Sequence, residues 1–417
     1  MEDVVHLTSL VGRDASLVFS LERRKVSYLL ICSSYPPVLG GSEVEAQRVS
    51  QALIARGHKA LVVTVGGPPM PPGGDYVDAC GVPVRQFGEN LPVKFRQHAY
   101  ALGVAWTLWR ERDNYEVAYF LMQGLQLLTG LPMARLLGKA VVMKFSCSSL
   151  VAVMTASWTG RTVLDFLRRW PTRILVLNDG MREECRQANL DLNHVSWMPN
   201  PVNTDEFRPL PEAEKQALRR KLDISEDSIV TLFVGRLDHQ KKLPWTLGSF
   251  AKVVRERPQA LLVLVGDGPL REEIHALVRS LGLENNVRFT GRLQMTGVLE
   301  WMQASDITIL VSEVEGLPCS LIEAMAAGLP PVVSRIPAHT QLVDHEIHGL
   351  LTELGNEEDT ARAVIRLMDE PEFRARCGQA ARERMIRQFS TAEVVRYYET
   401  LFEEILESPA PAGGTKS

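Results

Sequence analysis

Two glutamates eight positions apart, Glu315 and Glu323, are the first candidates for a functional site in this sequence. A buried-strand pattern over residues 306–312 ends just before Glu315. An apolar helical pattern then runs from Pro318, which suits the first turn of a helix, to Gly328, which suits its end. We therefore expect Glu315 in the loop at the carboxyl end of a strand and Glu323 early in the following helix.

The backbone between the two glutamates predicts an anion site. Because the first N–H groups of a helix lack partners within it, the N–H groups of residues 316–321 are expected to attract a phosphate. They include those of Gly316, Ser320 and Leu321. The flanking carboxylates can accept hydrogen bonds from hydroxyl groups, so a nucleotide sugar, with a ribose and a hexose on either side of a diphosphate, has a fitting layout. The alternative is an exposed loop acid followed by an acid that the helix dipole stabilises.

Length and composition indicate a two-domain protein of ordinary soluble type. The 417 residues exceed what one hydrophobic core usually serves, and a net charge of -4 gives no reason to expect nucleic acid. The six cysteines contain no C-x-x-C pair, which argues for a reducing compartment and against a zinc site. The sequence shows no signal-peptide pattern and no apolar run of about 18 residues. We expect a cytoplasmic protein whose membrane contact, at the inner face, could only be peripheral.

The first half of the chain alternates strand and helix patterns. Apolar runs over residues 25–34 and 59–66 predict buried strands, and a helix is expected to begin between them at Ser42. Ser42 and Glu45 match an S-x-x-E capping box, and Gly57 stands where a helix-ending glycine belongs. This is the pattern of a βαβ unit.

The second half predicts a parallel sheet of five strands separated by helical patterns, at residues 228–237, 260–268, 287–291, 306–312 and 330–334. Four prolines break all periodicity over residues 198–211, which we interpret as the connection between two sheets. The predicted class is α/β. Two doubly wound, Rossmann-like domains would face each other across a cleft and bind ligands at the carboxyl ends of their strands.

The segment with the two glutamates closely resembles the E-x7-E signature of the family-4 retaining glycosyltransferases of the GT-B fold, or glycosyl transferases group 1. The likeness continues through "EGLPCSLIEAMAAGLP" and covers about residues 25–407. It implies that Glu323 binds the ribose hydroxyls of a donor and that Glu315 lies against the transferred sugar. "VGRLDHQKK" is similar to the family's G-R-L-x-x-x-K-G stretch, which implies that Arg236 and Lys241 neutralise the donor diphosphate.

Three other stretches resemble the surroundings of the nucleotide in that family. "LVLVGDGPL" and "VRFTGRL" imply backbone contacts to the base near Gly266, Arg292 and Leu293. "PPVLGGSEVEAQRVSQALIARGH" implies that Gly40 and Gly41 let the backbone approach the diphosphate from the opposite side. Solvated charges and plain turn glycines are the alternative interpretations of these motifs.

The predicted domain boundaries combine the patterns and the resemblance. An N-terminal extension covers residues 1–24, the acceptor-side domain residues 25–203 and the donor-side domain residues 204–390. The resemblance implies that a last helix, residues 391–407, packs back on the first domain. The tail 408–417 is expected to be disordered.

The sequence departs from the family pattern at several positions. Gln123 and Ser146 stand roughly where many relatives carry histidines beside the transferred sugar, and neither can act as a base at neutral pH. Lys242 and Pro201 stand where the family usually has glycine. A non-catalytic relative therefore remains an alternative.

The resemblance implies an enzyme that moves a sugar, with retention of configuration, from a UDP- or GDP-linked donor to a hydroxyl of a glycan, lipid-linked or small-molecule acceptor. The expected catalytic residues are Glu315, Arg236 and Lys241. Neither a metal nor a cofactor is expected, because cations and a helix start can stabilise the leaving diphosphate. The alternatives are a non-catalytic nucleotide-sugar-binding protein, a nucleotide-sugar epimerase and a sugar phosphorylase with lysine-bound pyridoxal phosphate.

Aromatic residues interleaved with arginines in the first half predict a membrane-facing or acceptor surface. They are Trp106, Trp109, Trp158 and Trp170, with Arg96, Arg110, Arg161, Arg168 and Arg169 between or beside them. Ordinary packing of the tryptophans is the alternative.

Overall fold

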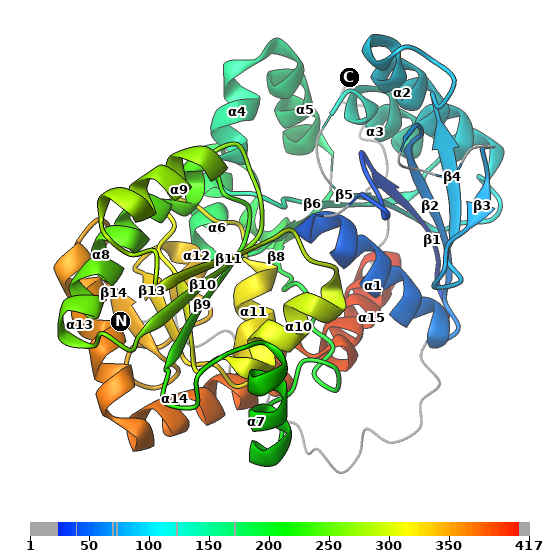
Figure 1. The fold of residues 1–417 in the computed structure, drawn as a ribbon. Helices are drawn as coiled ribbons and strands as arrows, with labels where there is room; N and C mark the ends of the chain where they lie inside the picture. The colour runs from blue at the N-terminus through cyan, green and yellow to red at the C-terminus, as the bar shows by residue number, and fades with distance from the viewer. Residues whose placement is uncertain are drawn as a thin grey trace.

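The computed structural model places the chain in two α/β domains, each built on its own sheet (Figure 1). It describes residues 24–38, 40–68, 71, 74–121, 124–170 and 172–407. The predicted tail 408–417, Gln123 and all of the predicted N-terminal extension except Arg24 lie outside the described residues. The predicted α/β class with two facing parallel-sheet domains is confirmed.

The strands of the first domain are β1 (Ser27–Cys32), β2 (Lys59–Val65), β3 (Tyr76–Val77), β4 (Pro83–Phe87), β5 (Val117–Leu121), β6 (Ala140–Lys144), β7 (Arg173–Val176) and β8 (Val195–Trp197). They form one sheet in the order β3-β4-β2-β1-β5-β6-β7-β8, parallel except for β3. The helices are α1 (Gly41–Ala55), α2 (Val93–Arg110), α3 (Gln126–Leu136), α4 (Leu150–Ala156), α5 (Trp158–Arg169) and α6 (Asp179–Gln187). A 3-10 turn, Leu192–His194, precedes β8.

Strand β1 shows how the apolar runs build this domain. Successive side chains of a strand point to opposite faces of the sheet. Leu29 and Ile31 belong to the apolar cluster on the side of α2 and α3, whereas Tyr28, Leu30 and Cys32 belong to the cluster on the side of α1. The continuous apolar run is therefore explained by burial of both faces, as a central parallel strand requires.

The second domain holds a parallel sheet made of β9 (Val230–Val234), β10 (Leu261–Val265), β11 (Val287–Gly291), β12 (Ile307–Leu310), β13 (Pro331–Ser334) and β14 (Leu350–Thr352). The order is β11-β10-β9-β12-β13-β14. Its helices are α7 (Glu212–Lys221), α8 (Leu243–Glu256), α9 (Arg271–Ser280), α10 (Met295–Ala304), α11 (Cys319–Ala326), α12 (Pro337–Thr340), α13 (Glu357–Asp369) and α14 (Pro371–Arg384). A 3-10 turn, His239–Lys241, follows β9, and a π-helical turn, Met385–Phe389, follows α14.

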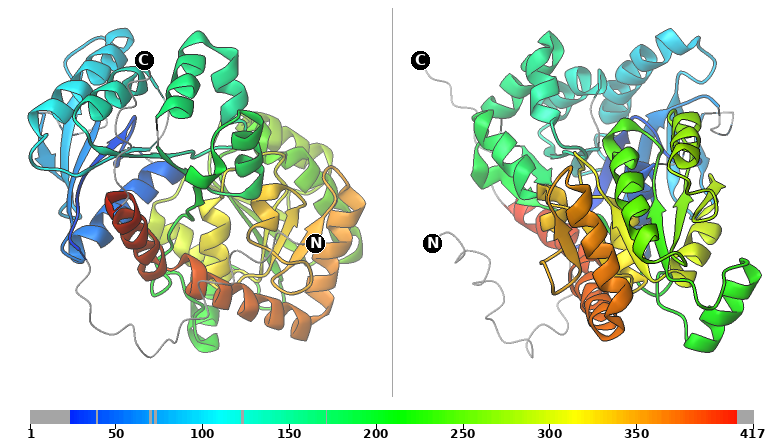
Figure 2. Two further views of the ribbon diagram at one scale, coloured as in Figure 1. Left: turned by 180° about the vertical axis from the view of Figure 1, so that it is seen from behind. Right: turned by 60° about the vertical axis from the view of Figure 1, so that its left-hand side comes forward.

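The last helix, α15 (Thr391–Glu407), returns from the second domain and packs against α1 of the first domain, which the view from behind shows best (Figure 2). Val202 of the connecting segment pairs with Ser390 in an isolated bridge at the point of return. The Glu399 carboxylate of α15 then accepts hydrogen bonds from Nε and Nη2 of Arg56, at 2.7 and 2.8 Å. The first domain therefore depends on a helix that follows the whole second domain in the sequence.

Two local predictions are wrong. Glu45 does not close a capping box with Ser42, because α1 has no side-chain cap and the Glu45 carboxylate is buried against Lys144. The second sheet has a sixth strand, β14, which is only three residues long and carries too little pattern to be found.

Candidate functional site

Two adjoining pockets lie between the domains at the carboxyl ends of the strands. The larger, of about 830 Å³, is bounded by the start of α1 and by the residues that follow β9, β10 and β11. The smaller, of about 370 Å³, lies between residues 314–320, the loop after β6 and the connecting segment. Gly41, Lys241 and Cys319 line both pockets, so the two spaces meet at the start of α11.

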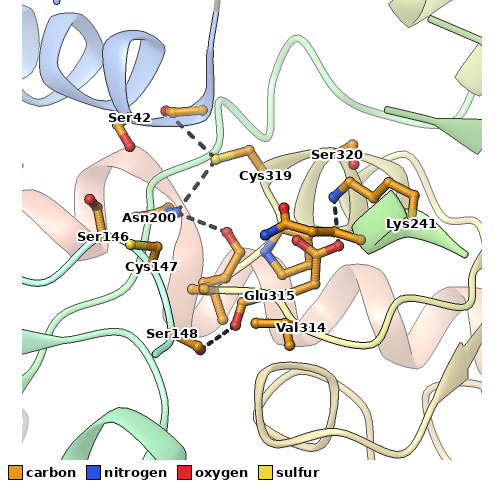
Figure 3. A pocket seen from close by; sticks show the side chains of 15 residues that line it. Ser42, Ser146, Cys147, Ser148, Asn200, Lys241, Val314, Glu315, Cys319 and Ser320 are labelled. Atoms are coloured by element: carbon orange, nitrogen blue, oxygen red, sulfur yellow. Dashed lines mark hydrogen bonds and ion pairs between the residues drawn. The ribbon is translucent and has the colours of Figure 1, made fainter. Parts of the chain in front are cut away.

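Lys241 and Glu315 form an ion pair at this junction (Figure 3). Lys241 Nζ lies 2.5 Å from Glu315 Oε1, and both side chains are largely buried. Lys241 is carried by the 3-10 turn after β9, which Asp238 caps through a bond from the N–H of Gln240 at 3.1 Å. The loop carboxylate and the lysine, which were predicted as separate site residues, therefore act as one unit in which each group orients the other.

The backbone conformation of Lys242 explains why the family usually has glycine at this position. Its φ of 44° lies in the left-handed region, where glycine is favoured, so the usual glycine has a conformational reason. Here the lysine adopts the same conformation and its Nζ lies 2.8 Å from a carboxylate oxygen of Glu313.

Glu323 lies in the wall of the larger pocket and is 6 % exposed. It pairs with Arg48 of α1, whose Nη1 donates to Glu323 Oε1 at 2.9 Å. Burial raises the pKa of Glu323 above its ordinary value, and the Arg48 guanidinium acts in the opposite direction. Sequence reasoning missed Arg48, because nothing local to α1 indicates which carboxylate of the other domain it meets.

Six other predicted donor residues line the larger pocket. They are Gly40, Gly41, Arg236, Gly266, Arg292 and Leu293. The Arg236 side chain is 71 % exposed at the pocket, and its Nε lies 4.0 Å from Asp238. Gly266 has a packing reason to be glycine, because a Cβ there would lie 1.9 Å from the carbonyl oxygen of Gly235.

The start of α11 only partly matches the predicted anion site. Gly316 and Ser320 line the smaller pocket, and Pro318 has no N–H to offer. Leu321 was predicted to present a free N–H, which is wrong: that group donates to the carbonyl of Pro318 at 3.1 Å, and the side chain is buried in the core. Within the described part of the chain, the N–H groups of Gly316 and Leu317 donate to no other protein group and stay available to a ligand.

Two further titratable groups near the site are neutral at physiological pH. Burial raises the pKa of Cys319 to about 12, so its thiol is not a nucleophile there. Burial lowers the pKa of His339 to about 4, while Glu315 opposes that shift. Its Nδ1 lies 2.8 Å from the carbonyl oxygen of Ser334, which makes Nδ1 the protonated nitrogen. His339 is a buried histidine near Glu315 that sequence reasoning did not identify.

Side chains of the first domain and the connecting segment complete the smaller pocket. Ser146, which stands roughly where many relatives carry a histidine, lines it together with Ser148 and Asn200 (Figure 3). Asn200 Oδ1 accepts a hydrogen bond from Lys144 Nζ at 3.1 Å, and Asn200 Nδ2 lies 3.5 Å from Cys319 Sγ. Cys319 of the second domain thereby meets side chains of the first domain and of the connecting segment.

Metal-ligating side chains do not cluster within the described part of the chain, in which no group of three or more His, Cys, Asp or Glu residues could hold a metal ion. None of the described helices combines the length and the apolar character needed to cross a bilayer.

Comparisons with known proteins agree with this geometry. The family model "Glycosyl transferases group 1" matches residues 214–384, and the model "Glycosyl transferase 4-like domain" matches residues 40–201. The chain is 33% identical over 189 residues to the N-acetyl-alpha-D-glucosaminyl L-malate synthase of Bacillus anthracis, which covers 45% of the chain and 49% of that protein. It is 24% identical over 398 residues to an uncharacterized glycosyltransferase of Methanocaldococcus jannaschii, which covers 91% of the chain and 98% of that protein.

A solved structure shows the shared fold. HepE of Anabaena in complex with UDP superposes with a TM-score of 0.75 at 20% identity, over 91% of this chain and 100% of that one. The same protein has been solved with UDP-glucose, with a TM-score of 0.73. Because one family model covers each domain and the neighbour shares the two-domain architecture, the chain belongs to the family-4 glycosyltransferases of the GT-B fold, a family of sugar-transferring enzymes.

Proposed function

We propose that this protein transfers a sugar from a nucleotide-diphosphate donor to an acceptor hydroxyl, with retention of configuration and without a metal ion. The observation that carries the proposal is the junction of the two pockets. There the Lys241–Glu315 pair and the start of α11 face one space, while Glu323 stands in the wall of the adjoining one.

The two pockets suit the two halves of such a donor. The larger would take the nucleotide, with the base near Arg292 and Leu293 and the ribose at Glu323. The diphosphate would then lie at the junction, between the start of α1 and the cations Arg236 and Lys241. The smaller pocket, lined by short polar side chains and backbone, would take the sugar.

The charge distribution supports a dissociation in which the diphosphate leaves with the bonding electrons. Negative charge that develops on the leaving oxygen would be stabilised by Lys241, Arg236 and the helix start more strongly than in the bound substrate. We propose that the departing phosphate oxygen takes the acceptor proton on the same face of the sugar. His339 is a poor general base for this step, since its pKa is lowered to about 4 and its side chain is fully buried.

UDP is the first donor nucleotide to test, because the neighbour HepE binds UDP and UDP-glucose. The acceptor would be a glycan, a lipid-linked molecule or a small hydroxylated molecule.

Exposed apolar side chains support peripheral contact with a membrane. Trp106, Trp109 and Trp158 are between 41 % and 69 % exposed on α2 and α5, which both contact α3 in one helical layer. Arg110 lies 4.8 Å from the ring centroid of Trp106. Trp170 does not join them, since it is partly buried against Phe166 and the packing alternative applies to it. Sedimentation with anionic vesicles should carry down the wild-type protein more than a Trp109→Ala/Trp158→Ala variant, and equal sedimentation would contradict the contact.

The donor assignment is tested by thermal shift with UDP, GDP, ADP and TDP and their sugars. A ligand at 100 times its dissociation constant stabilises the folded protein by about 2.7 kcal/mol. We expect Glu323→Ala and Arg236→Ala to abolish this response and to keep the far-UV circular dichroism of the wild type. Arg362→Ala is a matched control, since that arginine is an exposed side chain of α13 whose one ion pair among the described residues is with Asp359 of the same helix.

Activity is tested by incubating the donor with and without candidate acceptors and reading the anomeric configuration of the product by NMR. A retained configuration at the anomeric carbon in buffer with EDTA supports the proposal. Conversion of the donor without an acceptor would indicate an epimerase instead, and normal nucleotide binding by both alanine variants would refute the donor assignment.

A further inference from the structure

Three consecutive carbonyl groups of the loop that carries Glu315 are held by side chains from outside the second domain. Each accepts one hydrogen bond: Glu315 O from Ser148 Oγ at 2.5 Å, Gly316 O from Asn178 Nδ2 at 2.5 Å, and Leu317 O from Asn200 Nδ2 at 3.0 Å. The first and third of these bonds are drawn in Figure 3. All three donors lie outside the domain that carries the loop, so these hydrogen bonds hold the loop across the domain boundary.

The three donors come from three neighbouring strands of the first sheet. Ser148 follows β6, Asn178 follows β7 and Asn200 follows β8, and these strands lie side by side in that order. The carboxyl ends of parallel strands meet at one edge of a sheet, so the donors form a row along the cleft. The loop of the second domain lies along this row, one peptide group for each strand.

The contact is close enough to require a glycine in its middle. A Cβ on Gly316 would lie 2.6 Å from the carbonyl oxygen of Ser146 and 3.4 Å from the Cα of Cys147. The backbones of the two domains therefore nearly touch at Gly316. Because C=O and N–H point in opposite directions across a trans peptide, the bonds to Glu315 O and Gly316 O turn the N–H groups of Gly316 and Leu317 away from the first domain.

We infer that Ser148, Asn178 and Asn200 form an interdomain latch that holds Glu315 and the neighbouring N–H groups in the position needed for sugar transfer. The latch residues are positioning residues, and they act only when the two domains are closed. This inference rests on the proposed function for its effect on catalysis, but the latch itself is a property of the two domains and can be measured without a substrate.

Both asparagines have a second contact that separates the latch from folding. Asn178 Oδ1 caps α6 by accepting from the N–H of Met181 at 3.0 Å. Asn200 Oδ1 accepts from Lys144 at 3.1 Å. Aspartate keeps these accepting contacts and is equally favoured as a helix cap, but it has no N–H to donate and places an oxygen against a carbonyl oxygen. Asn178→Asp and Asn200→Asp should therefore fold and lose the latch.

The experiment combines small-angle X-ray scattering with steady-state kinetics on the full chain. Loss of two hydrogen bonds of ordinary strength is expected to shift the ratio of closed to open molecules by about 5- to 150-fold. The Asn178→Asp/Asn200→Asp variant should show a larger radius of gyration than the wild type, both without ligand and with saturating UDP. Its kcat should fall about tenfold or more, with the thermal midpoint close to that of the wild type.

Ser148 supplies a matched pair of variants. Ser148→Thr keeps the hydroxyl donor and should retain the wild-type radius of gyration, whereas Ser148→Ala should enlarge it in the direction of the double variant. If Ser148 had only a structural role, the two variants would have the same radius of gyration.

The outcomes decide separately on the latch and on the proposed function. A radius of gyration of the double variant equal to that of the wild type overturns the latch, whatever the kinetics. An opened variant with an unchanged kcat overturns the positioning role. A wild-type protein that transfers no sugar refutes the proposed function, and scattering still decides whether the latch exists.

Discussion

Lys144 and Glu45 form an ion pair inside the first domain, and replacing Lys144 by methionine tests what this buried pair contributes. The Lys144 side chain is 0% exposed and that of Glu45 is 2% exposed, so neither charge can turn to water. Lys144 also donates to Asn200 Oδ1 at 3.1 Å, which links the pair to the latch. Lys144→Met keeps an unbranched side chain of similar length and removes the ammonium group, with its charge and its bond to Asn200.

Breaking a buried pair on one side costs about 3–5 kcal/mol, because the remaining charge stays buried without a partner. At a urea m value of about 3 kcal/mol per M, a loss of 3 kcal/mol lowers the urea midpoint by about 1 M. The paired control is Lys144→Met/Glu45→Gln, in which no charge remains. We expect the second substitution to recover most of the lost midpoint.

The loss of stability caused by Lys144→Met should also depend on pH, which a simple loss of packing would not produce. Burial raises the pKa of Glu45 and Lys144 lowers it, so without Lys144 the folded-state pKa rises further above the unfolded value. A raised pKa favours the folded state at low pH, and that contribution is lost as pH rises through the folded-state pKa. Lys144→Met should therefore be closer to the wild type at pH 5 than at pH 8.

Urea titrations followed by far-UV circular dichroism at both pH values measure these effects. A midpoint shift of Lys144→Met below about 0.3 M at pH 8 would refute the reasoning, since it corresponds to less than about 1 kcal/mol. A double variant as unstable as the single one would also refute it, because the cost would then not come from the unpaired carboxylate.

Two further predictions concern Gly316 and His339. Gly316→Ala places a methyl group 2.6 Å from Ser146 O, so the domains should not close fully and kcat should fall about tenfold or more; an unchanged radius of gyration with UDP would contradict this. The pKa of His339 is lowered to about 4, so its contribution to stability is present above the ordinary value of 6.5 and is lost as pH falls towards 4. This contribution is worth up to about 3 kcal/mol. His339→Gln should therefore reduce the change of the urea midpoint with pH in that window. Parallel curves of midpoint against pH for variant and wild type would show that the histidine is not buried in its neutral form.

Much of the fold could be predicted because its signals are local. The strand before Glu315 and the helix that begins after Pro318 follow from an apolar run, a proline and a closing glycine, and the structure confirms them as β12 and α11. Strand β14 was missed because three residues give no measurable period. The capping box at Ser42 was wrong because its glutamate has a stronger partner, Lys144, 99 residues away.

The donor side of the site was more predictable than the side that faces it. Glu323, Lys241 and Glu315 lie in motifs whose spacing carries information. Asn178 lies in no such motif, and Arg48 lies in the stretch of residues 36–58 without a signal of its own; their roles arise from bonds that cross the cleft, to Glu323 Oε1 and to Gly316 O. A side chain whose partner lies in another domain produces no periodic pattern in its own segment of the sequence.

Two α/β domains and a helix start flanked by two carboxylates follow from the sequence, because apolar periodicity, prolines and glycines influence the backbone within a few residues of their own position. Three features follow only from the packing of the domains: Lys241 pairs with Glu315, Arg48 pairs with Glu323, and three successive carbonyls accept hydrogen bonds from residues that follow β6, β7 and β8. Hydrogen bonds and ion pairs need contact within about 3 Å, and contact at that range between distant segments depends on how whole domains pack.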